Sequence, residues 1–217
     1  MTPHQMTIST GKRGHTMRIT AQDIYGLYSP SECALRVFLR ARDEPEAEPG
    51  PFEQVLMRLG QRHEAGHLAT FPQVADLRSL PFEDRARKTG ELVASGAKVL
   101  YQPVLKCLAT IDGVVCEVVG EPDFLIREND GYVVRDVKLV RHVDEDNHPE
   151  VILQVQLYGW LYEKVFGQRP LRSEVFSGQS ELVVVPYNEE NVLRHVCARP
   201  LRRFLPDTPC GSANSGR

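Results

Sequence analysis

The stretch from Gly120 to Trp160 decides the fold, and it reads GEPDFLIRENDGYVVRDVKLVRHVDEDNHPEVILQVQLYGW. Two mostly apolar segments flank Asn129-Asp130-Gly131, a sequence typical of a tight turn between antiparallel strands. A longer apolar segment with helical character follows, from Val151 to Phe166. We therefore expect a β-hairpin followed by a helix that belongs to the core.

Each predicted strand carries two polar residues that lie two positions apart: Glu121 with Asp123, and Asp136 with Lys138. Because side chains alternate faces along a strand, each pair shares one face. A loop over the first two turn residues places Asp123 opposite Asp136. The same loop places Glu121 opposite Lys138, whereas a loop over the last two turn residues places Asp123 opposite Lys138. In both registers the four groups lie on one face of the hairpin.

Carboxylates that face each other on neighbouring strands repel, and this is destabilising unless a cation lies between them. Lysine supplies one positive charge, whereas a divalent metal supplies two. Hard oxygen ligands suit Mg²⁺ or Mn²⁺. A solvated strand face with cross-strand ion pairs explains the two strands equally well, so the strands alone leave both interpretations open.

The helix after the hairpin carries two polar residues that bear on this choice. Gln154 and Tyr158 are four positions apart, so they lie on the same helical face, and Leu161 and Val165 continue that stripe. The simple interpretation is an amide and a phenol at the edge of a core helix. The alternative is that both side chains line a site formed by the carboxylates.

The ordered set Asp123, then Asp136-Val137-Lys138, then Gln154-x-x-x-Tyr158 resembles the PD-(D/E)XK nuclease superfamily. It resembles in particular the RecB-like branch, which adds Q-x-x-x-Y after D-x-K and includes RecB-type exonucleases and CRISPR-associated acquisition nucleases. That branch usually carries an upstream histidine, and Gly60-Gln61-Arg62-His63-Glu64 fits this position.

The resemblance implies a metal-dependent deoxyribonuclease, with exonuclease action favoured over endonuclease action. Asp123, Asp136 and His63 would bind Mg²⁺ or Mn²⁺, together with the carbonyl of Val137, and imidazole ligation favours Mn²⁺. Lys138 would orient the attacking water or offset charge in the transition state. The remaining candidates are Gln154 and Tyr158 as positioning residues in the catalytic set, and Glu64 and Glu121 as outer-shell carboxylates.

The resemblance spans roughly residues 18–187 and implies a restriction-endonuclease-like α/β core. In that core a short mixed sheet is flanked by helices, and an N-terminal helical region precedes it. We expect a single nuclease domain over 18–205, with its helical part at about 18–95 and its catalytic core at about 97–187. The polar segments 1–17 and 206–217 are expected to be disordered, and Met17 is a candidate for the true start of the protein, because the ordered pattern begins right after it.

The remaining sequence patterns predict the order of the elements. The expected helices cover a short segment after Thr20-Ala-Gln-Asp23, about 30–40, 52–70 with His63 inside it, 83–95, 151–166 and 189–204. The expected strands cover 99–111, 114–126 with a bend at Gly120, the segment with Asp136, and a buried strand at 181–187. The segments 72–81 and 167–180 are expected to be loops.

Composition limits the function classes. The chain has 217 residues, 41% hydrophobic residues and a formal net charge of −3, so no global basic field indicates nucleic acid. Local basic patches suffice for phosphate contacts. The apolar runs are too short for a membrane span, and no signal-peptide pattern begins the chain. We therefore expect a cytoplasmic protein without membrane association.

The five cysteines argue against a disulfide framework, because their number is odd and the chain looks cytoplasmic. Some acquisition nucleases bind an iron–sulfur cluster through one early and three late cysteines. Cys33 fits the early position, but only Cys197 and Cys210 follow late in the chain, and four thiolates are usually required. No cluster is expected, and Cys107 and Cys116 are expected to be buried thiols.

The expected partner is DNA, with single-stranded ends favoured, and a helicase or repair complex would deliver it. No P-loop is present in the sequence, so the chain alone is not an ATP-driven helicase. Arg36, Arg40 and Arg62 are candidate phosphate contacts. Two other function classes stay open: a catalytically inactive relative that binds DNA or protein, and a metal-binding regulatory domain without nucleic acid.

Overall fold

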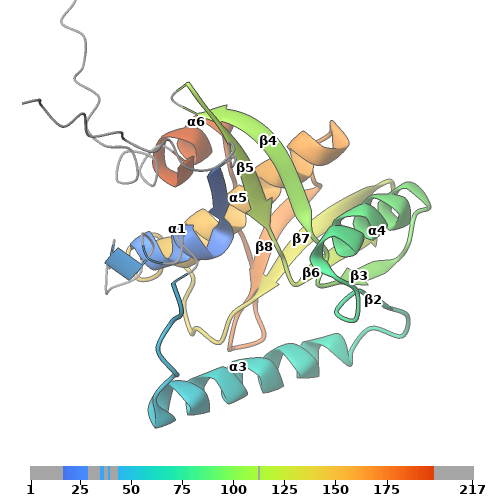
Figure 1. Ribbon diagram of the computed structural model, residues 1–217. Helices are drawn as coiled ribbons and strands as arrows, with labels where there is room; N and C mark the ends of the chain where they lie inside the picture. Colours follow the sequence, from blue (N-terminus) through green and yellow to red (C-terminus); the bar gives the residue numbers. More distant parts are fainter. Residues whose placement is uncertain (1–16, 29–34, 37–38, 40–43, 112, 198–217) are drawn as a thin grey trace, which may run out of the picture.

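The computed structural model describes residues 17–28, 35–36, 39, 44–111 and 113–197 (Figure 1). Within these ranges it has a mixed α/β architecture with two sheets and no closed barrel, which confirms the expected α/β class. A three-stranded sheet has the order β1-β5-β4, and a six-stranded sheet has the order β2-β3-β6-β7-β8-β9. No helix in the described ranges is long and apolar enough to cross a bilayer.

The strands of the three-stranded sheet are β1 (Met17–Thr20), β4 (Leu105–Ile111) and β5 (Val114–Gly120). The six-stranded sheet contains β2 (Ala75–Asp76), β3 (Val99–Tyr101), β6 (Phe124–Glu128), β7 (Gly131–Val137), β8 (Arg172–Phe176) and β9 (Leu182–Val184). The helices are α1 (Ala21–Tyr28), α3 (Pro51–Leu68), α4 (Phe82–Ala94), α5 (Pro149–Phe166) and α6 (Glu189–Asn191), and a π-helical segment follows at Val192–Cys197.

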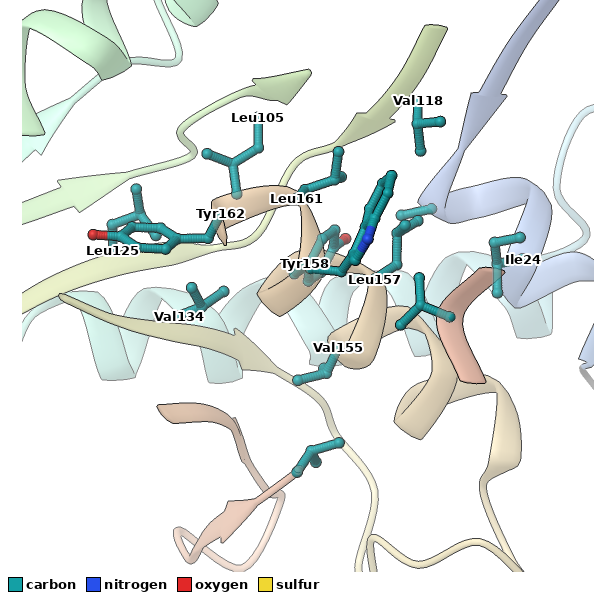
Figure 2. Close-up of a cluster of buried hydrophobic side chains, with 14 of the residues drawn as sticks. Ile24, Leu105, Val118, Leu125, Val134, Val155, Leu157, Tyr158, Leu161 and Tyr162 are labelled. Carbon is teal, nitrogen blue, oxygen red and sulfur yellow. The ribbon is translucent and has the colours of Figure 1, made fainter. Parts of the chain in front are cut away.

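Helix α5 is the centre of the core. It contacts β4 and β5 of the three-stranded sheet and β7 and β8 of the six-stranded sheet, and α1 packs against it (Figure 1). Its residues Tyr158, Leu161 and Tyr162 belong to one buried cluster with Leu105 of one sheet and Leu125 of the other (Figure 2). A helix that is covered on several sides must be apolar around most of its circumference, which explains the weak periodicity of this segment.

Two long segments were predicted as single strands. In the structure each segment forms two strands, one in each sheet. The expected strand 114–126 divides into β5 and β6 after Gly120, where a side chain would meet Tyr158 Cδ1 and Leu161 Cδ1 at 2.7 Å. The expected strand 99–111 divides into β3 and β4 at Gln102, whose φ is 55°. Glycine is therefore required at 120 by close packing of α5, and the bend expected there is confirmed.

The β6–β7 hairpin has the first of the two registers expected from the sequence. Phe124 pairs with Arg135 and Glu128 pairs with Gly131, so the loop consists of Asn129 and Asp130. Asn129 has a φ of 49°, a left-handed conformation that asparagine tolerates better than most residues. Phe124 and Arg135 form the pair farthest from the loop. The next position in this register places Asp123 opposite Asp136.

Two expectations for the C-terminal half were wrong. The segment 167–180, expected as a loop, contains β8, which is parallel to β7 and has Ser173 and Glu174 buried. The expected buried strand 181–187 is a short strand β9 at the edge of the sheet, with Leu182 and Val184 about half exposed. The polar residues of β8 gave no sign of a buried strand in the sequence. The run of valines in β9 predicted a fully buried strand, but a strand at the edge of a sheet keeps some of its side chains exposed.

Other differences are smaller. The loop expected at 72–81 includes the two-residue strand β2, and β1 was not expected. The last expected helix, 189–204, is α6 followed by the π-helical segment as far as residue 197, and its remainder lies outside the described residues. Most of the helix expected at 30–40 also lies outside them, as do the termini 1–16 and 198–217.

Helix α3 lies apart from the rest of the fold along most of its length (Figure 1). Its first turns expose apolar side chains, with Phe52 72% and Met57 55% exposed. Only its C-terminal part packs on the six-stranded sheet, where Leu68 joins a second apolar cluster that includes Phe124 and Val137. The C-terminal half of α3 therefore positions its side chains relative to the ends of β6 and β7.

Candidate functional site

The hairpin brings two aspartates together where β6 begins and β7 ends. The backbone N–H of Val137 donates to Asp123 Oδ2 at 2.7 Å, and Asp136 is 2% exposed. Burial raises the pKa of Asp123 well above its ordinary value, and the charge of Asp136 raises it further. Two carboxylates this close need a nearby cation if both groups are to be ionised.

Lys138 supplies part of that positive charge. Its Nζ lies 2.7 Å from Asp136 Oδ2. Burial alone would lower the pKa of Lys138, but the attraction of Asp136 and Asp123 outweighs this effect, and the pKa is raised. Lys138 is therefore held in its charged form beside both aspartates, although Asp123 still has a raised pKa.

Glu64 on α3 reaches the same place through Gln102. Gln102 Nε2 donates to Glu64 Oε1 and to Asp123 Oδ1, each at 2.8 Å, and the Tyr101 hydroxyl donates to Glu64 Oε1 at 2.7 Å. Gln102 has a left-handed backbone, which is strained for a residue with a side chain and is frequent at functional sites. Gln102 was not predicted as a site residue, and its only signal in the sequence is the Gln-Pro step that interrupts a strand pattern.

The pair on α5 lies beside the aspartates. Gln154 Nε2 donates to the Tyr158 hydroxyl at 2.9 Å, and both side chains are buried. Burial raises the pKa of Tyr158 well above its ordinary value, and the charges of Asp136 and Asp123 raise it further. Gln154 Oε1 is buried without a hydrogen-bond partner in the described structure. An unsatisfied acceptor this deep in the protein requires an explanation, and a water, an ion or a substrate group would supply one.

Tyr25 on α1 is a further neighbour that the sequence analysis missed. Its ring centre lies 6.0 Å from Lys138 Nζ, within the range of a cation–π contact. Burial raises the pKa of Tyr25, and the carboxylate of Glu150 raises it further. Glu150 is itself buried and bonded to His148 Nδ1 at 2.9 Å. Tyr25 and Glu150 therefore lie around Lys138 on the side of α1 and α5.

The structure does not bring His63 to the aspartates. Its ring stacks on Phe176 with centroids 5.2 Å apart, and no contact recorded among the described residues joins it to Asp123 or Asp136. Consecutive residues of a helix point about 100° apart around its axis. Glu64 therefore faces Gln102 while His63 faces β8, so α3 contributes a carboxylate where the family resemblance implies an imidazole.

Residues His63 to His67 read HEAGH, which fits the H-E-x-x-H pattern of zinc sites on helices. The structure gives these residues other partners. Arg135 Nη1 lies 3.0 Å from His67 Nε2, and a guanidinium can only donate, so this nitrogen accepts a hydrogen bond from a cation. Glu64 is bonded to Tyr101 and Gln102. This arrangement does not resemble a zinc centre.

The other candidates have different partners or lie outside the described residues. Glu121 was expected opposite Lys138 but is paired with Arg85, at the surface. Arg36 is paired with Glu46, Arg62 lines a pocket beside His63, and Arg40 lies outside the described residues.

The cysteines are only partly covered by the described residues. Cys33 and Cys210 lie outside them, and only the backbone of Cys197 is described. Cys116 is buried, as expected, whereas Cys107 is only half-buried, and both are free thiols. Burial raises the pKa of each of these two thiols, which makes them less reactive.

The acidic groups fit a divalent cation as a pair rather than as a larger cluster. Among the residues that the structure describes, no group of three or more His, Cys, Asp or Glu side chains is placed to hold a metal ion. Mg²⁺ typically needs only one or two carboxylates, because it keeps several waters and accepts substrate phosphate oxygens. Lys138 supplies one positive charge to two carboxylates, so the pair keeps a net negative charge when both are ionised. Asp123 and Asp136 therefore form a suitable ligand pair for a hard cation.

Comparisons with known proteins do not assign a family. No protein-family model matches the chain, and no curated protein sequence matches it. A solved structure titled "Crystal structure of SSO0001" matches with a TM-score of 0.45 and 16% sequence identity, over 85% of this chain and 76% of that chain. A likeness at this level carries no inference about function.

Proposed function

We propose that this protein is a metal-dependent nuclease that hydrolyses DNA phosphodiester bonds, with the restriction-endonuclease-like core of the RecB-like PD-(D/E)XK branch. The observation that carries the proposal is the convergence of Asp123, Asp136 and Lys138 where β6 begins and β7 ends. Gln154 and Tyr158 lie beside them, in the order and spacing of the RecB-like motifs.

Asp123 and Asp136 would hold Mg²⁺ or Mn²⁺, with the carbonyl of Val137 as a further oxygen ligand. The bound ion would lower the pKa of a coordinated water and offset charge on the phosphate. Lys138, held charged by both aspartates, would orient the attacking water. Gln154 and Tyr158 would keep the lysine and the water in place through their mutual hydrogen bond.

In the proposed site, α3 contributes the carboxylate of Glu64 rather than the imidazole of His63. Gln102 fixes Glu64 beside Asp123, so the Glu64 carboxylate is placed to bind a metal-coordinated water. We propose exonuclease action on DNA with single-stranded ends, in repair, recombination or defence, with a helicase or repair complex as partner.

The second candidate is an inactive relative that binds DNA or protein. The observation that favours it is the ion pair between Lys138 and Asp136, which offsets the charge of this carboxylate without a metal. Nuclease assays distinguish the two functions. The purified protein is incubated with end-labelled single- and double-stranded DNA in parallel with Mg²⁺ and Mn²⁺. Cleavage that requires metal and is lost in Lys138→Ala supports the nuclease, whereas binding without cleavage supports the second candidate.

A further inference from the structure

A pocket of about 440 Å³ lies between the C-terminal half of α3 and the end of β8. Its lining consists of Leu59, Arg62, His63, Gly66, His67, Thr70, Phe176 and Ser180. The volume is within the range of small-molecule sites in proteins. Nothing in the proposed catalytic mechanism uses this pocket.

Flat aromatic rings form the walls of the pocket. The ring of Phe176 stacks on His67, with centroids 3.9 Å apart and an interplanar angle of 20°. It also stacks on His63, with centroids 5.2 Å apart and an angle of 11°. The three rings cover part of one another's faces, and a planar ligand would stack on the aromatic surface that remains turned toward the pocket.

The polar groups of the pocket are few and specific. The Arg135 guanidinium contacts His67 Nε2, so the ring of His67 accepts a hydrogen bond and is uncharged. His63 Nε2 is buried without a hydrogen-bond partner in the described structure. Arg62 contributes a positive charge from an exposed position. A ligand with a flat apolar face and a polar edge would satisfy these features.

The pocket adjoins the candidate catalytic site. Phe176 pairs with Val137 across β7 and β8, and its carbonyl oxygen accepts from the backbone N–H of Lys138 at 3.0 Å. His63 lines the pocket, whereas the next residue, Glu64, is linked to Asp123 through Gln102. The pocket and the aspartates therefore lie near the same end of β7, joined by α3.

We propose that this pocket binds one nucleobase of the DNA strand whose phosphodiester bond reaches Asp123 and Asp136. This inference rests on the proposed function and specifies how that site takes its substrate. A nucleobase is planar, stacks on aromatic side chains irrespective of sequence, and presents hydrogen-bonding groups at its edge. Arg62 would contact the adjoining phosphate or stack on the base. A base can enter only if it is unstacked, so the pocket selects single-stranded ends.

Gly66 provides a direct test. A Cβ at Gly66 would meet no atom within 4 Å, so Gly66→Leu extends a side chain toward the pocket without a backbone clash. Gly60, on the same helix and outside the pocket lining, is open in the same way, and Gly60→Leu is the matched control. Both changes favour helix formation, so neither is expected to unfold the protein. Gly66→Ala gives an intermediate change in pocket volume.

Binding is measured by fluorescence anisotropy without metal, with labelled oligothymidylate and an oligomer of equal length made of abasic spacers. The wild type and Gly60→Leu are expected to prefer the thymidylate by about 5- to 150-fold, the range for one stacked base. Gly66→Leu is expected to lose this preference, and Gly66→Ala to lose part of it. Equal binding of both oligomers by the wild type, or a preference unchanged in Gly66→Leu, would overturn the proposal.

Cleavage of the abasic oligomer with Mn²⁺ separates this proposal from the nuclease assignment. Gly66→Leu is expected to cleave it like the wild type, because the reaction does not need the pocket. Cleavage without base preference would reject the pocket and keep the nuclease. Base preference in a wild type that cleaves no DNA would support the pocket and reject the nuclease.

Discussion

Gln102 and Asp123 are joined by a hydrogen bond of 2.8 Å from the amide Nε2 to the carboxylate Oδ1. The same amide nitrogen donates to Glu64 on α3, so one neutral side chain holds two carboxylates from different parts of the chain. This relationship positions α3 against the hairpin, and it occurs at a residue with a strained backbone.

Replacement of Gln102 by alanine is expected to destabilise the protein by about 1–3 kcal/mol, because two partly buried carboxylates lose their donor. Gln102→Gly loses the same hydrogen bonds but adopts the left-handed backbone without strain. We expect the glycine variant to be about 1 kcal/mol more stable than the alanine variant. Urea denaturation measures both differences. Equal stabilities of the two variants would show that the backbone conformation is not strained.

The buried carboxylate of Glu174 is expected to be important for stability. It is 1% exposed and is bonded to Arg135 Nε at 2.7 Å and to Arg172 Nε at 2.6 Å. Glu174→Gln leaves two guanidinium groups without their shared anion, at a cost of about 3–5 kcal/mol. Glu128 is a partly exposed partner of Arg172, and Glu128→Gln is the control with an expected cost below about 1 kcal/mol. Similar melting temperatures for the two variants would contradict this prediction.

Stability is expected to fall between about pH 6.5 and pH 4 because of His67. Burial lowers the pKa of His67 to about 4, and the positive charge of Arg135 lowers it further. An unfolded histidine titrates near 6.5, so in this interval the unfolded state binds the proton that the folded state excludes. Stability is therefore highest above pH 6.5 and decreases as the pH falls, by about 3 kcal/mol from this group alone.

The measurement for this prediction is chemical denaturation at a series of pH values, with His67→Gln for comparison. Glutamine can still accept a hydrogen bond from Arg135 but does not titrate. The variant is expected to show a smaller decrease in stability between pH 6.5 and pH 4. Parallel pH profiles for the wild type and the variant would mean that His67 is not held neutral in the folded protein.

The sequence predicted the local parts of this structure well. The β6–β7 hairpin was predicted from the turn residues Asn129-Asp130-Gly131 with two registers left open, and the structure has the first of them. Helix α5 could be recognised from its length and apolar character. The division of two strands at Gln102 and Gly120 depends on contacts with α3 and α5, and such distant contacts leave no periodic signal.

The candidate site, too, could be predicted from the sequence only where it depends on local features. Alternation along the strands placed Asp123 near Asp136, but it could not determine whether His63 or Glu64 would face them. These two residues are adjacent in one helix, so the rotation of α3 against the sheet decides which one points to Gln102. Strand β8 was missed because its buried glutamate is compensated by arginines from β7 and from β8 itself.

If a divalent cation binds between Asp123 and Asp136, calorimetric titration with Mn²⁺ in the absence of DNA detects it. The wild type is expected to bind Mn²⁺, and Asp123→Asn and Asp136→Asn are each expected to weaken binding at least about tenfold, or about 1.4 kcal/mol. Glu145→Gln, at an exposed position, is the control and is expected to bind like the wild type. Equal Mn²⁺ affinity in the wild type and in both aspartate variants would mean that the two aspartates do not bind a metal ion.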